Sequence, residues 1–176
     1  MRKLTTQRIA ILIDADNLEI FARQTFERHI DYRALWDAMN GREIVRAIYF
    51  KPRECPARLR TFLDKGLGIE VQLPPKNVDT YLSIAGVTLA ERVDAIALCC
   101  GDSDYVPLTE YLRCKGCKSE VWCFPGATSP KLRETADEFR PLDEGILLPM
   151  LVKPAPANVS PIASILSLSR FGEVPQ

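Results

Sequence analysis

The chain has 176 residues, of which 47% are hydrophobic and 26% are charged, values typical of one soluble globular domain with a buried core. Lys plus Arg and Asp plus Glu both number 23, so the formal net charge is zero. A polyanion would therefore have to bind a local basic patch, because the molecule as a whole supplies no attractive field.

Membrane association is not expected from the sequence. No apolar run approaches the roughly 18 residues that a membrane span needs. Asp14 and Asp16 interrupt the first apolar run, Ile9–Ile13, too early for the core of a signal peptide. We therefore expect a cytoplasmic protein with no membrane partner.

Strand-like and helix-like segments alternate between residues 8 and 140. We predict strands near 8–14, 42–50, 69–73, 94–100 and 118–124, with helices between them. This alternation is typical of an α/β fold with a mainly parallel sheet, here of about five or six strands in a three-layer sandwich.

Three of the helices have recognisable starts, and they are expected over 32–39, 56–66 and 131–139. Asp31 is a suitable N-cap for the first of them. Pro56 and Pro130 suit the first turns of the other two, since proline is tolerated where the helix has no partner for an N–H.

Two acidic clusters follow predicted apolar strands, one at Asp14 and Asp16 and one at Asp102 and Asp104. In open α/β sheets, ligands bind outside the carboxyl ends of the strands, so both clusters can contribute to one site. Carboxylates held close together repel one another, and either their pKa values rise or a cation neutralises them. Hard oxygen ligands of this kind suit Mg²⁺ or Mn²⁺.

Asp79 is the third candidate acid, because it begins the apolar stripe of a predicted helix that continues through Leu82, Gly86 and Leu89. On that stripe its side chain can point toward the strand ends. The alternative is that Asp79 only caps the helix or interacts with its dipole, and the pattern leaves both interpretations open.

The six cysteines give little support to a metal or disulfide site. Cys114 and Cys117 have the spacing of half a zinc site, but no second half with Cys or His at ligand spacing is present. Their Cys-x-x-Cys run ends a predicted helix at Gly116, where the dipole does not favour a thiolate. We predict reduced structural thiols.

The sequence changes character after residue 148. We assign 1–148 to the folded domain and 149–176 to a Pro-rich linker and C-terminal tail, to which no chemistry is assigned.

Four motifs, in this order and spacing, resemble the NYN domain of the LabA-like group, in the PIN-like nuclease superfamily. They are Ile11-Leu-Ile-Asp14-Ala-Asp16-Asn17-Leu18, Lys76-Asn-Val-Asp79, Gly101-Asp102-Ser103-Asp104-Tyr105-Val-Pro107-Leu, and the segment from Ser129 to Phe139. The resemblance covers about residues 8–145. It implies a PIN-like Rossmannoid sheet and an acidic pocket that binds Mg²⁺ or Mn²⁺ and hydrolyses RNA.

Carried over by position, the resemblance implies four catalytic and metal-binding acids. These are Asp14, Asp79, Asp102 and Asp104. Asn17 and Ser103 are expected to donate hydrogen bonds to substrate phosphate. Asp16 would alternate away from Asp14 if the strand continued, so we do not predict it as a metal ligand.

The chain departs from the family pattern at two positions. Family members often carry a further acid six residues beyond the one matched by Asp79, where this chain has Ala85. They usually have Ser before the Gly-Asp-Ser-Asp run, where this chain has Cys100. Losing one carboxylate should weaken a second metal site more than the first.

RNA, expected to be single-stranded, would need positive charge near the acids. The best local patch, residues 51–60, follows the second strand and includes Lys51, Arg53 and Arg58, although a solvated helix face has the same composition. Lys76 is a further candidate, because a lysine at a helix start is unfavourable for the dipole and phosphate contact would account for it.

Two other functions are compatible with the sequence. The fold could be an RNA- or protein-binding regulatory module without turnover, an interpretation that Ala85 favours. Alternatively, Asp14-Ala-Asp16 resembles the start of a haloacid-dehalogenase-type phosphatase, although Leu18 stands where those enzymes have Thr or Val. The sequence gives no oligomeric state, and a homodimer is one arrangement to test.

Overall fold

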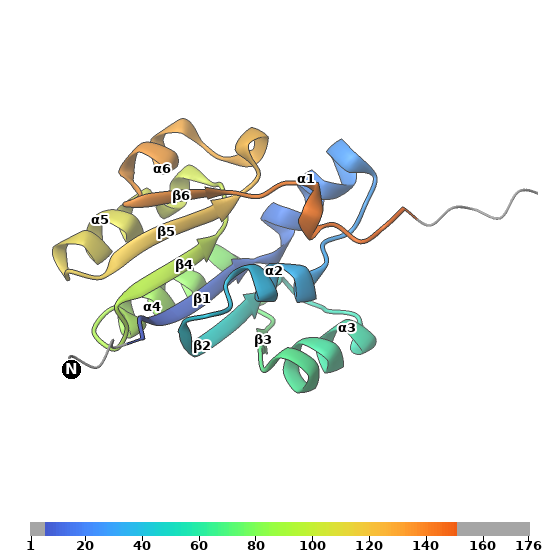
Figure 1. Cartoon of the computed structure of the whole chain (residues 1–176), viewed down its shortest axis with the longest axis horizontal. Coiled ribbons are helices and arrows are strands. Elements are labelled where there is room, and N and C mark those ends of the chain that lie inside the picture. The colour runs from blue at the N-terminus through green and yellow to red at the C-terminus, as the bar shows by residue number, and fades with distance from the viewer. Residues whose placement is uncertain (1–5, 151–176) are drawn as a thin grey trace, which may run out of the picture.

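Six parallel strands form one sheet in the computed structural model, which describes residues 6–150 (Figure 1). The strands are β1 (Arg8–Asp14), β2 (Glu43–Phe50), β3 (Glu70–Gln72), β4 (Ala95–Cys99), β5 (Lys118–Cys123) and β6 (Glu138–Pro141). Their order in the sheet is β3-β2-β1-β4-β5-β6. Because β1 and β4 lie side by side in the middle, their carboxyl ends are neighbours.

Helices flank this sheet in a three-layer α/β arrangement, as predicted. They are α1 (Ala15–Phe26), α2 (Tyr32–Ala38), α3 (Ala57–Thr61), α4 (Val78–Leu89), α5 (Val106–Cys114) and α6 (Pro130–Thr135). Helices α4 and α5 pack against the sheet and against each other, with α6 beside α5, while α2 lies over the opposite face near β1 and β2 (Figure 1).

The core is centred on the two middle strands. Ile9–Ile13 of β1 and Ala95–Cys99 of β4 are buried along their whole length, with no residue more than 1% exposed. Continuous burial explains why these strands are apolar at every position rather than at alternate ones, as is usual for parallel strands covered on both faces. The acids that follow each strand are therefore carried on a rigid support.

Several predicted boundaries are confirmed. All five predicted strands are present, and the Asp31 side chain caps α2 by accepting hydrogen bonds from the backbone N–H groups of Arg33 and Ala34. The chain turns with positive φ at Gly41 after α2 and at Gly116 after α5. All six cysteines are free thiols, as expected.

One predicted helix end is wrong, and another lies close to its predicted position. The helix expected over 131–139 stops at Thr135, and Glu138–Pro141 forms β6 instead. The Asp137 carboxylate accepts hydrogen bonds from both the backbone N–H and the hydroxyl of Ser119, which holds this segment against β5. The helix after Pro56 ends at Leu67, close to the predicted Gly66. Its last part widens into a π-helical segment, Phe62–Leu67, and the left-handed Gly68 follows.

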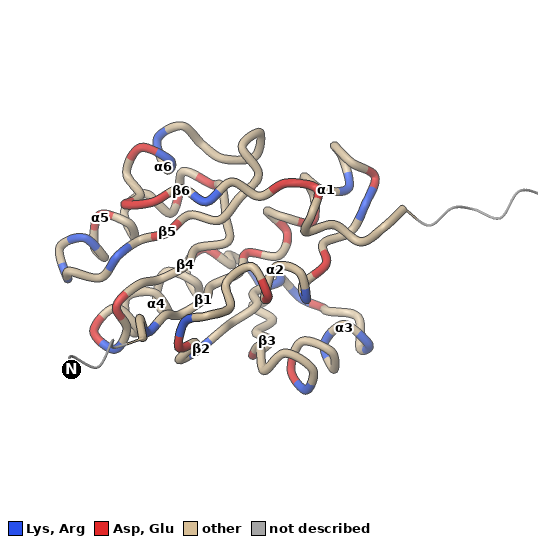
Figure 2. Tube along the Cα trace, in the orientation of Figure 1, with Lys and Arg blue, Asp and Glu red and all other residues tan. Residues whose placement is uncertain are grey.

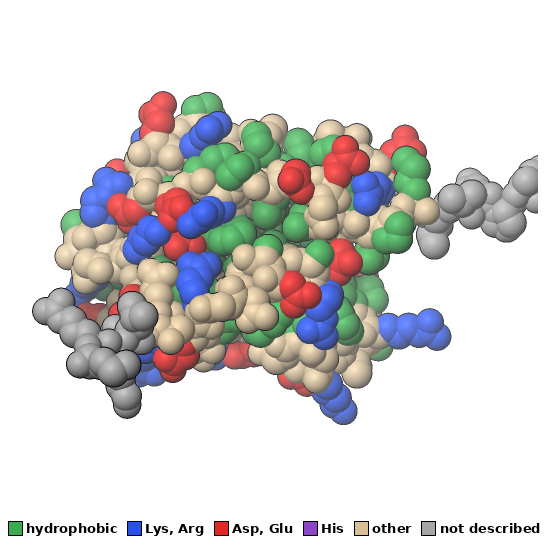
Figure 3. All heavy atoms as spheres, in the orientation of Figure 1, with side chains coloured by type: hydrophobic (Ala, Val, Ile, Leu, Met, Phe, Trp, Pro, Cys, Tyr) green, Lys and Arg blue, Asp and Glu red, His purple; other side chains and the backbone are tan. Residues whose placement is uncertain are grey.

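Charge is distributed unevenly over the surface. Figure 2 shows acidic positions at the start of α1, where β1 ends, and basic positions along α3. Over β5 and β6, on the face shown in Figure 3, charges of both signs are intermixed. The predicted linker and tail, 149–176, lie almost entirely outside the described residues.

Candidate functional site

Asp14 is where the strand ends and the helix begins. It is the last residue of β1 and the N-cap of α1, with its Oδ1 accepting a hydrogen bond from the Asn17 backbone N–H at 3.2 Å. An N-cap carboxylate both satisfies a free N–H and interacts favourably with the helix dipole. Only 7% of Asp14 is exposed, so this charge is held in a largely buried position.

A single hydroxyl group connects Asp14 to Asp79. The Tyr105 hydroxyl lies 2.9 Å from Asp14 Oδ2 and 2.8 Å from Asp79 Oδ1. Burial and the neighbouring Asp14 charge raise the pKa of Tyr105 far above its usual value, so the hydroxyl keeps its proton. One proton cannot fully satisfy two carboxylates, and the pair is therefore short of positive charge.

The pKa of Asp14 is raised by this environment. Burial is the main cause, and the nearby charges of Asp79 and Asp16 act in the same direction. The hydrogen bonds from Tyr105 and Asn17 oppose the shift without cancelling it. Asp79 lies in the first turn of α4, two residues after the N-cap Asn77, so it is not the cap residue. Its position is that of a first-turn acid, which the helix dipole favours, and it also contacts Tyr105.

These acids line an open cavity of about 550 Å³ beside the carboxyl end of β1. Its walls are formed by Asp14, Asp16, Asn17, Ile20, Phe21, Gln24, Pro52, Asn77, Val78, Asp79 and Ala127. Three of these residues are acidic, and among the described residues that form the wall none is Lys, Arg or His. A cavity of this composition favours a cation.

Asn17 ties the two central strand ends together. Its Oδ1 accepts a hydrogen bond from the Gly101 backbone N–H at 2.8 Å, which joins the start of α1 to the end of β4. Only glycine fits at 101, because a Cβ atom there would lie 2.1 Å from the Ala127 carbonyl oxygen. The amide nitrogen of Asn17 is the part left for the predicted phosphate contact.

The second acidic cluster is arranged differently. Asp102, Ser103 and Asp104 are exposed, and none of them is part of the cavity wall. Asp102 Oδ1 accepts hydrogen bonds from the Asp104 backbone N–H at 3.1 Å and the Ser103 hydroxyl at 3.4 Å. Within residues 6–150, no three Asp, Glu, His or Cys side chains are placed to hold one metal ion together. The structure thus joins Asp14 to Asp79 and does not join Asp102 or Asp104 to them.

Of the predicted basic residues, none lines the cavity. Lys76, Arg53 and Arg58 are exposed. Pro52, next to Arg53, does form part of the wall, so the end of β2 reaches the same rim as the acids. Asn77 also lines the cavity and was missed, although an Asn before a helix was a usable signal, because Asn readily adopts a positive φ such as the 47° of this residue.

Lys51 was placed in the basic patch by the sequence, but its charge is used internally. Its Nζ lies 3.0 Å from Asp16 Oδ1 and 2.5 Å from Glu19 Oε2. Asp16 is in the first turn of α1, so the strand alternation used to set it aside does not apply. It lines the cavity, but its carboxylate is already paired.

Tyr105 is the residue whose role was missed most clearly. Tyr49, Phe50 and Tyr105 are fully buried, so none of them stacks on a base. The sequence signal for Tyr105 was its place directly after the second acidic cluster. A buried tyrosine usually needs a hydrogen-bond partner, and Tyr105 finds two acids as partners.

The comparisons with known proteins identify the family. The family model of the NYN domain matches residues 8–143. The chain belongs to the NYN domain family. The family is part of the PIN-like nuclease superfamily. NYN domains in general bind RNA, and NYN and PIN-like nucleases typically use divalent metals. The LabA-like subgroup stays a prediction.

A solved structure supports the fold assignment. The chain is similar to a protein of unknown function from Vibrio parahaemolyticus, with a TM-score of 0.77 and 28% sequence identity. The match covers 84% of this chain and 100% of that protein. No curated protein sequence matches this chain. Within residues 6–150, no helix is long and apolar enough to cross a membrane, and the cytoplasmic location stays a prediction.

Proposed function

We propose that this NYN protein is a metal-dependent ribonuclease that hydrolyses phosphodiester bonds of single-stranded RNA. The observation that supports this most strongly is the pair of carboxylates, Asp14 and Asp79, that share one tyrosine proton on the wall of an acidic cavity. Such a pair is stabilised by a cation, and the cavity wall provides none.

A divalent ion fits the donors that are present. The free lone pairs of Asp14 and Asp79 are hard oxygen donors of the kind that Mg²⁺ and Mn²⁺ prefer. Mg²⁺ keeps several waters and is commonly held by one or two carboxylates together with substrate phosphate. We therefore assign Asp14 and Asp79 as the central ligands, with Asp102 and Asp104, after the adjacent strand β4, completing the site through bridging water.

The bound ion would polarise the phosphate and lower the pKa of an attacking water. The chain's own residues account for the remaining requirements. The Asn17 amide group and the Ser103 hydroxyl can donate hydrogen bonds to phosphate oxygens without adding negative charge. Asp104 is exposed and can accept a hydrogen bond from the water, which orients it. Arg53, Arg58 and Lys76 would bind phosphates farther along the strand.

Ala85, which stands where family members often carry an acid, does not line the acidic cavity. Ala85 lines a different cavity, with Tyr81, Ile84 and Gln72 among its walls. A carboxylate missing there leaves the Asp14–Asp79 pair unchanged. The regulatory module without turnover remains the second candidate, because Asp102 and Asp104 stand apart from the pair.

Cleavage of a mixed-sequence single-stranded RNA tests this function. Wild-type protein is assayed with Mn²⁺, with Mg²⁺ and with a chelator, beside Asp14→Asn and Asp79→Asn. We expect metal-dependent cleavage, and each variant should lower its rate at least about 100-fold. Substitution of residues that only support the metal ligands commonly lowers metal affinity or activity 10–100-fold, and substitution of a ligand should have a larger effect.

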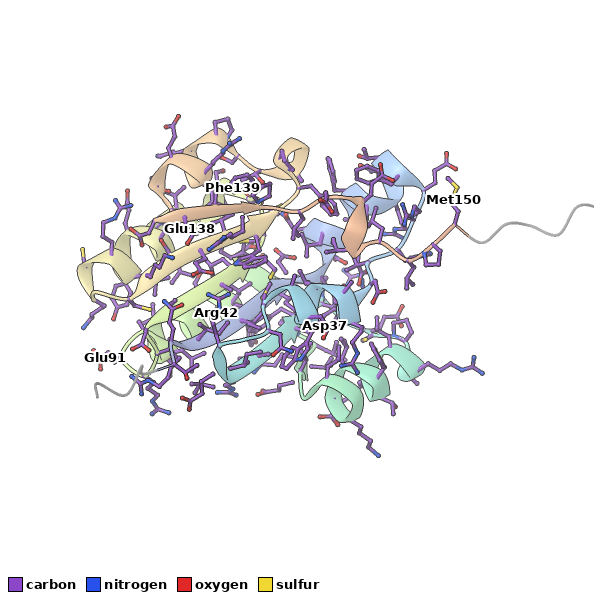
Figure 4. All side chains as sticks on the ribbon, viewed as in Figure 1. Asp37, Arg42, Glu91, Glu138, Phe139 and Met150 are labelled. Carbon is purple, nitrogen blue, oxygen red and sulfur yellow. The ribbon has the colours of Figure 1, made fainter. Side chains whose placement is uncertain are left out.

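Asp37→Asn is the matched control, because Asp37 is an exposed acid of α2 that does not line the cavity (Figure 4). It should keep wild-type activity. Asp102→Asn and Asp104→Asn then show whether the second cluster takes part. A wild-type protein that binds RNA but never cleaves it would overturn the nuclease proposal in favour of the binding module.

A further inference from the structure

A second cavity lies on the other side of α1 from the acids. Its volume is about 650 Å³, within the range of small-molecule sites. Its wall residues come from α1, the start of α2, the loop after β2 and α3. Figure 1 labels these helices and β2. The last described segment closes the cavity, because the Leu148 backbone N–H donates a hydrogen bond to the His29 carbonyl oxygen at 2.8 Å.

Most of the wall is apolar. Ile30, Tyr32, Pro56, Leu59 and Leu148 contribute to it. Such a wall suits a flat, largely apolar group better than a phosphate, which needs several donors. A ligand of the right class is therefore a planar ring with polar edges.

The charged groups inside the cavity are already satisfied. Glu19 accepts hydrogen bonds from the Tyr32 hydroxyl at 2.7 Å, the Tyr49 hydroxyl at 2.9 Å and Lys51 Nζ at 2.5 Å. The pKa of Glu19 is lowered, since these donors and the Lys51 charge outweigh the effect of its burial. Glu19 and Lys51 thus form a polar part of the cavity wall, and their charges are paired with each other rather than available to a ligand.

Arg23, His29 and Glu54 remain as polar groups around the cavity, and all three are exposed. Among the described residues Arg23 and Glu54 have no ion-pair partner. They can contact the polar edge of a ring or the sugar and phosphate attached to it.

The two cavities share a wall. Lys51 Nζ contacts Asp16, which lines the acidic cavity, and Glu19, which lines the second one. Asp16 and Glu19 are three residues apart on α1, so less than one helical turn separates them. An RNA strand with a phosphate at Asp14 would bring a neighbouring nucleotide to the second cavity.

We propose that the second cavity is a nucleobase-binding subsite, which takes the base of an RNA nucleotide near the scissile phosphate; this rests on the proposed ribonuclease function. Proteins that recognise single-stranded RNA commonly bind splayed-out bases against aromatic and apolar side chains. Tyr32 and Leu59 would contact the ring, while Arg23 would contact the backbone at the mouth.

Cys55 provides a direct probe, because its half-buried thiol lines this cavity. Cys114 is the other accessible thiol, while the remaining four are buried, so the test uses a Cys114→Ser protein. Burial raises the pKa of Cys55, and its alkylation by iodoacetamide is therefore followed at mildly alkaline pH, with chelator present.

AMP and UMP are the probes, and ribose 5-phosphate is the control without a base. At a nucleotide concentration ten times its Kd, we expect AMP or UMP to slow alkylation about tenfold, since only free protein reacts. Ribose 5-phosphate should leave the rate unchanged. Equal protection by ribose 5-phosphate, or no protection by either nucleotide at millimolar concentration, would overturn the proposal.

A filled cavity tests the link to RNA. Leu59→Trp adds bulk inside the cavity, while Phe62→Trp places the same side chain at an exposed position that does not line the cavity. Leu59→Trp should abolish nucleotide protection and raise KM for RNA, with a wild-type circular dichroism spectrum and a cooperative urea transition in chelator as proof of folding. If Leu59→Trp still shows full protection, the base does not bind in this cavity.

Failure of this inference and failure of the nuclease proposal are distinguishable. The alkylation assay needs neither metal nor cleavage. Protection without cleavage would leave a nucleotide-binding domain, whereas cleavage without protection would leave a ribonuclease that holds its substrate by other contacts.

Discussion

Asp14 and Glu120 are two buried carboxylates of the same sheet with opposite surroundings. Glu120, in β5, is 1% exposed, and both of its oxygens lie 2.9 Å from Arg42 Nη1. Trp122 Nε1 donates a further hydrogen bond at 3.1 Å, and Lys118 lies on the same face. Arg42 and Glu138 mark this charged face of the sheet in Figure 4.

The pKa values of the two acids move in opposite directions for this reason. Burial alone would raise the pKa of Glu120, but the hydrogen bonds and charges from Arg42, Trp122 and Lys118 lower it. Burial raises the pKa of Asp14, whose neighbours include Asp79 and Asp16. A structural carboxylate carries its own cation, whereas Asp14 lacks one and is the acid to which a solution cation should bind.

The largest effect on stability is expected at the structural carboxylate. Glu120→Gln keeps the shape but removes the charge opposite Arg42 and Lys118. We expect the free energy of unfolding to fall by about 3 kcal/mol, as when one partner of a buried pair is removed. Urea denaturation measures this. Glu70→Gln, in the exposed pair with Arg46, is the control and should cost less than about 1 kcal/mol.

The same variant makes a pH prediction. The folded pKa of Glu120 lies below its ordinary value of 4.5, so its stabilising effect is present above that value. It is lost as the pH falls from about that value through the folded pKa. The stability gap between wild type and Glu120→Gln should therefore narrow on acidification. A gap that widens would mean that the charges of Arg42 and Lys118 do not stabilise the ionised carboxylate.

Added metal should stabilise the protein through Asp14 and not through Glu120. At a Mn²⁺ concentration 100 times Kd, the wild type should gain about 2.7 kcal/mol, because the ion binds the folded state alone. Thermal unfolding with Mn²⁺, Mg²⁺ or chelator measures the gain. Asp14→Asn and Asp79→Asn should lose it and Asp37→Asn should keep it. An equal gain in all four proteins would place the ion elsewhere.

The sequence predicted the strands well because apolar runs such as Ile9–Ile13 are buried continuously. The helix at Asp79 was predicted from its apolar stripe, of which Leu82, Gly86 and Leu89 are buried. The alternation of elements placed the acids that follow the strands at one edge of a parallel sheet, but it did not give the order of the strands. The sequence did not predict β6, because Ser129-Pro130 is typical of a helix start. The segment after this short helix is held against β5 by the hydrogen bond between Ser119 and Asp137, which lie 18 residues apart in the sequence.

Site geometry was less accessible to sequence reasoning. Four acids in a family pattern do not reveal which of them meet, and the structure joins only Asp14 and Asp79 through Tyr105. Lys51 looked available for RNA but is paired with Asp16 and Glu19 across the fold. Pairings of this kind depend on side-chain directions that spacing along the chain does not record.

Tyr105→Phe tests the Tyr105 hydroxyl, which donates a hydrogen bond to Asp14 where Glu120 has the Arg42 cation. The hydroxyl is the donor shared by Asp14 and Asp79, so its loss leaves one buried and one half-buried acceptor with fewer partners. We expect about 1–2 kcal/mol of destabilisation in chelator. Tyr81→Phe, at an exposed position of α4, is the control and should have little effect. No change in Tyr105→Phe would mean that the shared hydroxyl does not stabilise the pair.

Asp14→Asn should change stability less than Glu120→Gln or Tyr105→Phe, and it should raise stability where those two substitutions lower it. Asparagine caps helices as well as aspartate does, so the hydrogen bond from the Asn17 N–H can be kept. The buried charge and its repulsion of Asp79 are removed, and we expect the protein in chelator to gain about 1 kcal/mol, a usual size for a single stabilising substitution. Urea denaturation at neutral pH measures it.

With Mn²⁺ the wild type should instead be more stable than Asp14→Asn, because only the wild type gains stability from binding the ion. A carboxylate that destabilises the empty protein and stabilises the loaded one is maintained for its ligand rather than for the fold. If Asp14→Asn were instead less stable than the wild type in chelator, Asp14 would be a structural acid like Glu120, and its raised pKa would no longer indicate a cation site.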